Sequence, residues 1–150
     1  MAAAIAGFAA PAMAQPWSPL PPSGGRYCRY ADVVGLWDST LQRADEQGVA
    51  QQNAVAPHDY MRFKPDGSMM YFGSSRALTD PVQIGARLDE LDRTDGESYR
   101  AEIGAPGVLI IRRNGTPFQG FTCTLAANGR MFWTELKGQP PLRRTQVRLR

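Results

Sequence analysis

The feature that most constrains this 150-residue chain is a series of short segments with the composition of β-strands, separated by turn signals. The segments are rich in β-branched and aromatic residues, and Gly, Pro and Asn lie between them. Three of the turns have specific sequences, namely Pro65-Asp66-Gly67, Asn114-Gly115 and Asn128-Gly129. Eight strands are therefore predicted, nearly all joined by short connections, at residues 33–42, 60–64, 68–74, 97–103, 108–113, 118–125, 130–136 and 142–149.

One segment in the middle of the chain, residues 78–93, has the pattern of a helix. Thr79 or Asp80 can cap its start, and the proline that follows suits a first helical turn. Its apolar residues fall on one face at spacings of four and three, at Ile84, Leu88 and Leu91. The sequence therefore predicts an all-β fold, an eight-stranded antiparallel up-and-down barrel with one short helix between strands three and four. Eight strands are enough to close a barrel around its own side chains or one small ligand.

The first predicted hairpin indicates which of its side chains face the barrel interior. The Pro65-Asp66-Gly67 turn places Phe63 opposite Met69. The same register places Met61 opposite Tyr71. These four side chains are therefore expected to face inward.

The two later hairpins are less constrained by their turns. Across residues 104–107, Ile103 is expected opposite Val108, and Ala101 opposite Ile110. A two-residue Asn128-Gly129 turn pairs Leu125 with Phe132, whereas a longer turn brings Trp133 inward, and both alternatives stay open. The expected ligand-binding residues are those predicted to line the interior: Met61, Phe63, Met69, Tyr71, Tyr99, Ile110 and Phe132.

The chain divides into three parts. Residues 1–14 are mostly small and apolar, and Ala12-Met13-Ala14 fits the cleavage site of a signal peptide, although no Lys or Arg precedes the run. Residues 15–29 are predicted to be a Pro-rich N-terminal arm, and residues 30–150 the barrel domain. The apolar run is too short to span a membrane. A periplasmic or secreted protein is expected.

The two cysteines, Cys28 and Cys123, fit an oxidising compartment. A disulfide between them would stabilise the fold by about 4–5 kcal/mol in the chain-entropy model. The alternative is two separate buried thiols. No metal site or other cofactor is expected, because His58 is the only histidine and no Cys-x-x-Cys sequence is present.

The charged residues do not predict nucleic-acid binding or catalysis. The net charge is +3, and 15 of the 17 basic residues are Arg, but acidic residues are spread among them. Asp89, Glu90 and Asp92 are interpreted as the solvated face of the helix, and no base is evident for Ser39. The protein is therefore not expected to be an enzyme.

Gly35-Leu36-Trp37, the Pro65-Asp66-Gly67 hairpin and Arg143-Arg144 in the last strand together resemble the lipocalin-like, or calycin, family of small bacterial β-barrels. The resemblance implies that Gly35 and Trp37 are structural residues at a closed end of the barrel. It also implies that Arg144 or Arg143 lies across the Trp37 ring.

Two functions are consistent with such a barrel. The first is a non-catalytic carrier for a small hydrophobic or amphipathic ligand, with the predicted helix as a lid over one end. The second is a protein-interaction module, such as an inhibitor of a secreted protease acting through the N-terminal arm, which proline would stiffen. The expected partner is accordingly a small apolar ligand or another protein, with no nucleic acid and no membrane span. A hollow interior favours the first function and a filled interior the second.

Overall fold

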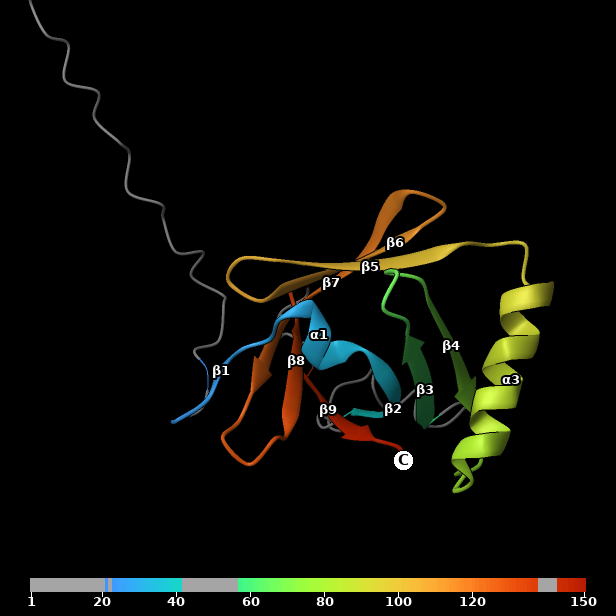
Figure 1. Ribbon diagram of the computed structural model, residues 1–150, viewed down its shortest axis with the longest axis horizontal. Helices are drawn as coiled ribbons and strands as arrows, with labels where there is room; N and C mark the ends of the chain where they lie inside the picture. Colours follow the sequence, from blue (N-terminus) through green and yellow to red (C-terminus); the bar gives the residue numbers. More distant parts are fainter. Residues whose placement is uncertain (1–20, 22, 42–56, 138–142) are drawn as a thin grey trace, which may run out of the picture.

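The computed structural model describes residues 21, 23–41, 57–137 and 143–150 (Figure 1). The predicted signal peptide and residues 15–20 and 22 of the predicted arm lie outside these ranges. The described elements, in chain order, are β1 (Arg26–Tyr27), α1 (Tyr30–Val33), β2 (Gly35–Leu41), β3 (His58–Phe63), β4 (Met69–Ser74), α3 (Pro81–Thr94), β5 (Tyr99–Gly104), β6 (Val108–Arg113), β7 (Thr116–Leu125), β8 (Met131–Glu135) and β9 (Arg143–Arg148).

The strands form one antiparallel sheet that curls into a nearly closed barrel of eight strands. Their order is β4-β3-β2-β9-β8-β7-β6-β5, so consecutive strands are neighbours and β9 returns to pair with β2. The sheet is split only between β4 and β5, which are joined by a bridge between Ser68 and Arg100 and by a hydrogen bond from Ala101 N to Gly67 O of 2.8 Å. The prediction of an eight-stranded antiparallel barrel is therefore confirmed. The short strand β1, within the predicted arm, pairs with β7.

Helix α3 lies beside the β3–β4 hairpin, on the outer face of the barrel (Figure 1). Its start is fixed by Asp80, whose Oδ1 accepts a hydrogen bond of 2.9 Å from Val82 N. Arg62 of β3 donates to Asp89 over 2.6 Å, and Lys64 after the strand pairs with Asp92. The helix is therefore attached to the side of the barrel, and its predicted role as a lid over one end is wrong.

The register of the β3–β4 hairpin is the predicted one. Phe63 pairs with Met69, and Met61 pairs with Tyr71. The turn between them is closed by Lys64 N, which donates to Ser68 O over 2.9 Å.

The β5–β6 hairpin differs from the prediction by one residue. Ala101 pairs with Ile111 and Ile103 with Leu109, because Gly104 remains in the strand and the turn holds only residues 105–107. Leu109 and Ile111 consequently face the core, and Ile110 points outward.

The β7–β8 hairpin has the longer of the two turns considered. Ala126 N donates to Arg130 O over 2.8 Å, which leaves three residues in the turn, with Gly129 at a φ of 82°. Cys123 therefore pairs with Trp133. Trp133 faces inward, and the predicted inward position of Phe132 is wrong.

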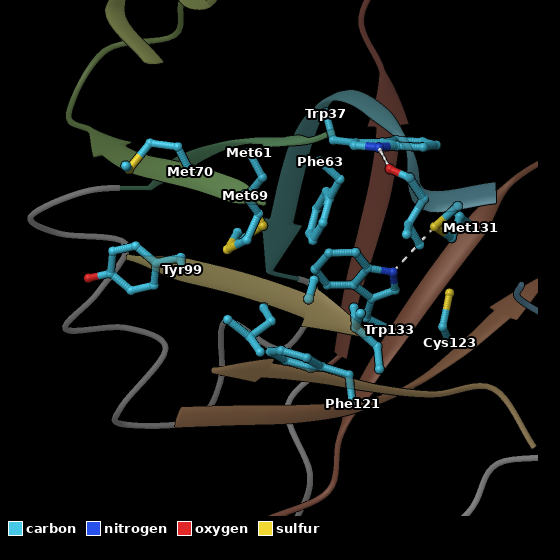
Figure 2. Close-up of a cluster of buried hydrophobic side chains, with 14 of the residues drawn as sticks. Trp37, Met61, Phe63, Met69, Met70, Tyr99, Phe121, Cys123, Met131 and Trp133 are labelled. Atoms are coloured by element: carbon cyan, nitrogen blue, oxygen red, sulfur yellow. Dashed lines mark hydrogen bonds between the residues drawn. The ribbon is translucent and has the colours of Figure 1, made fainter. Parts of the chain in front are cut away.

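Large side chains fill the barrel where α1 lies against it (Figure 2). Trp133 is fully buried, with its ring centroid 5.6 Å from that of Phe63 and 5.3 Å from that of Phe121. Cys28 and Cys123 form the predicted disulfide at the same end, with a Cα–Cα distance of 5.4 Å. Among the described residues, no helix is long and apolar enough to cross a membrane.

Candidate functional site

The barrel has two ends with different chemistry. At the α1 end, where β2 and β8 begin, the indole N–H of Trp37 donates to Val33 O over 2.7 Å (Figure 2). The guanidinium carbon of Arg148 lies 4.2 Å from the centroid of the Trp37 ring. Arg148 also donates to Asp32 O over 2.9 Å and to Val34 O over 2.8 Å. Trp37, α1 and Arg148 thus close this end of the barrel.

The expectation that Arg144 or Arg143 lies across Trp37 is wrong. The register of β2 and β9 pairs Trp37 with Arg148, so the arginines at the start of β9 lie at the opposite end. Arg143 is exposed, whereas Arg144 points inward and donates to Asp59 Oδ2 over 2.5 Å. The Arg144 and Asp59 side chains are only 9% and 13% exposed, so the barrel contains a buried ion pair at this end.

Between the α1 end and the far end, where β2 and β8 finish, a polar contact is buried inside the barrel. Gln146 Nε2 donates to Ser39 Oγ over 2.8 Å, and both residues are buried. Because an amide is not a base, this contact does not activate Ser39 as a nucleophile. The amide oxygen of Gln146, Oε1, is buried without a hydrogen-bond partner among the described residues.

A row of aromatic rings leads from the interior to the rim of the far end. The Tyr71 and Tyr99 rings meet edge to face, with centroids 5.3 Å apart. Phe118 follows at 6.3 Å from Tyr99, and the Arg113 guanidinium lies 4.5 Å from the centroid of Phe118. Burial raises the pKa of the Tyr99 hydroxyl, which also donates to Glu97 Oε2 over 2.5 Å.

A pocket with a volume of about 140 Å³ lies beside this row, between β6, β7 and β8. Ile110 and Leu136 come together on its wall because Gly120 has no side chain. A Cβ at Gly120 would lie 3.1 Å from Leu136 Cδ1 and 3.2 Å from Ile110 Cδ1. Phe118 adds an apolar surface to the same pocket.

Two charged residues complete the lining of this far-end pocket, Glu135 and Lys137. Burial raises the pKa of the Glu135 carboxyl, and the positive charge of Arg144 opposes part of that shift. The pocket thus combines an apolar wall with a partly desolvated carboxyl and an ammonium group. Such a lining suits a molecule that is apolar on one side and polar on the other.

The structure divides the predicted ligand-binding residues into three groups. Met61, Phe63 and Met69 face inward but are buried in the core, and Tyr71 and Tyr99 lie at the far end. Ile110 points outward and lines the far-end pocket, whereas Phe132 points outward beside Thr124 and Thr145, away from it.

The sequence did not point to Asp59 or Glu135, and it pointed to Arg144 only as a partner of Trp37 and not of Asp59. The alternation that identified Met61 identifies Asp59 when it is continued by two residues toward the N-terminus. For Arg144 and Glu135, the signal depended on strand pairings that the turns do not determine.

The described residues hold no group of three or more His, Cys, Asp or Glu side chains that could bind a metal ion. No family model, curated protein or solved structure matches this chain.

Proposed function

We propose that this protein is a non-catalytic, periplasmic or secreted barrel that binds a small amphipathic molecule in the far-end pocket. The observation that carries the proposal is the lining of that pocket, with Ile110, Leu136 and Phe118 on one side and Glu135 and Lys137 on the other. An apolar cavity of about 150 Å³ is large enough for benzene. The pocket volume of about 140 Å³ therefore suits one ring of the ligand.

The filled core goes against a ligand in the barrel interior and, by the criterion given above, favours the protein-interaction alternative. The ligand proposal therefore depends on the far-end pocket alone, which lies outside that core, with the outward-pointing Ile110 on its wall. Phe63, Trp133 and Met131 are almost completely buried at the α1 end, so a ligand there would have to displace well-packed side chains. Aromatic rings and polar groups line the far end instead, and they offer a ligand both contact area and hydrogen bonds.

A lipocalin-like origin and an extracytoplasmic location are parts of the same proposal. The contact of Arg148 with Trp37 next to Gly35 supports the first, because it provides the arginine–tryptophan packing that the resemblance implies. The Cys28–Cys123 disulfide supports the second, because such bonds persist in oxidising compartments.

A pair of glycine substitutions tests the ligand site. Gly120→Val places a side chain between Ile110 and Leu136, whereas Gly104→Val adds the same group where a Cβ meets no described atom within 4 Å. Both glycines lie in strands, where valine is favourable. Binding of phenol, benzylamine and benzoate is measured by calorimetry on each folded variant.

We expect Gly120→Val to weaken the tightest of the three ligands by about ten-fold or more, and Gly104→Val to leave its affinity unchanged. Tightest binding of the cationic benzylamine would identify Glu135 as the residue that selects the polar group, and tightest binding of the anionic benzoate would identify Lys137. Failure of all three to bind, or equal losses in the two variants, would contradict the proposal. Native mass spectrometry of protein taken from its own source then identifies the natural ligand.

A further inference from the structure

A second pocket, at the opposite end of the barrel, has a different character. It has a volume of about 540 Å³ and lies between α1, the β7–β8 turn and the end of β9. Arg130, Arg148 and Arg150 line it, together with Trp37 and Asp32. We call it the arginine pocket. It shares no lining residue with the far-end pocket.

The positive charge of the arginine pocket is not neutralised by its one acidic residue. Asp32 is already bound on both carboxylate oxygens by Arg26, at 2.6 and 2.7 Å. This pairing keeps the pKa of the Asp32 carboxyl below its usual value. Neither Arg130 nor Arg150 forms an ion pair with another described residue.

Arg148 is held in place without a ligand. Two backbone carbonyls and the Trp37 ring fix its guanidinium group, so little side-chain freedom remains to be lost when an anion binds. Guanidinium groups match the oxygens of phosphate in a two-point geometry, and three of them around one pocket favour a multiply charged anion.

We propose that the arginine pocket binds a phosphate-bearing anion. The phosphate belongs to a soluble phosphate ester or to the headgroup of an anionic lipid, and the same guanidinium chemistry recognises both. The site is independent of the ligand proposed for the far end.

The test uses inorganic pyrophosphate as the probe and the indole N–H resonance of Trp37 as the reporter. This resonance is placed to respond because Trp37 lines the pocket, whereas the backbone amide of Leu88, buried in α3 and outside the pocket, serves as an internal reference. The pocket variant is Arg130→Gln/Arg150→Gln. The control is Arg76→Gln/Arg93→Gln, which removes the same charge from exposed residues before and within α3.

We expect pyrophosphate to shift the Trp37 resonance of the unmodified protein, and the pocket variant to bind it about ten-fold more weakly or worse. The control should bind within about two-fold of the unmodified protein, because its lost charges are outside the pocket. An absent Trp37 shift, or equal weakening in both variants, would overturn the proposal.

Sedimentation with vesicles separates the two sources of phosphate. Vesicles of phosphatidylglycerol that carry the protein down, and release it on addition of pyrophosphate, identify a lipid headgroup. Pyrophosphate binding with no such sedimentation identifies a soluble phosphate ester. Vesicle binding that the pocket variant leaves intact would show that the pocket is not the lipid site and would overturn that assignment.

Discussion

Replacing both cysteines of the Cys28–Cys123 disulfide with alanine should lower the free energy of unfolding by about 4–5 kcal/mol. The bond closes a loop with a sequence separation of 95 residues. In the chain-entropy model, closing a loop of that length lowers the conformational entropy of the unfolded chain, which stabilises the folded state by about 4.7 kcal/mol at about 25 °C. In the folded protein the bond attaches β1 to β7, where Cys28 N also donates to Cys123 O over 3.0 Å.

The measurement is urea denaturation followed by tryptophan fluorescence. Either single substitution, Cys28→Ala or Cys123→Ala, already breaks the bond, so the double variant should be little less stable than each single one. Near-ultraviolet circular dichroism in the absence of urea establishes that the variants still fold. A loss below about 2 kcal/mol in the folded double variant would refute the reasoning, because the long loop would then contribute little to stability.

Three further predictions, on the backbone, the α1 end and the far end, are tested by equilibrium unfolding. Gly107→Ala should lower the free energy of unfolding by about 2 kcal/mol or more beyond the loss caused by Gly115→Ala. Both glycines have positive φ angles, but only a Cβ at Gly107 would meet Tyr27 Cβ, at 2.7 Å. Equal losses of unfolding free energy in the two variants would contradict this explanation. Arg148→Met should cost about 1–2 kcal/mol by removing the contact with the Trp37 ring and two hydrogen bonds, and an unchanged unfolding midpoint would count against it. Burial raises the pKa of Glu135, so its contribution to stability is present at low pH and is lost as pH rises through the folded pKa. Glu135→Gln should therefore stabilise the protein at about pH 7 and have little effect at about pH 4; a difference independent of pH would refute this assignment.

Strand register was predicted correctly where the turn sequence determines how the two strands of a hairpin pair. Pro65 and Gly67 determine the β3–β4 turn, and the predicted partners of Phe63 and Met61 are correct. Gly104 and Gly107 both lie between the predicted fourth and fifth strands, and from the sequence either glycine could mark the strand end. Only the structure, with Gly104 paired and Gly107 at a φ of 73°, shows which one does.

Features that depend on strands far apart in the chain were not predictable in the same way. Trp37 and Arg148 meet because β2 pairs with β9, and no turn joins these two strands. A shift of four residues along β9 separates the observed partner of Trp37 from the expected Arg144. The buried Asp59–Arg144 pair depends on the same long-range register.

The pairing of β9 with both β2 and β8 also has a consequence for how the chain is made. Without β9, the remaining pairings would leave two sheets, β2–β4 and β5–β8, linked by the Ser68–Arg100 bridge and by the disulfide. A chain that stops before Arg143 would leave β2 and β8 with unpaired edges, which are templates for aggregation. We therefore expect that a chain terminated before Arg143 is insoluble rather than a shortened barrel.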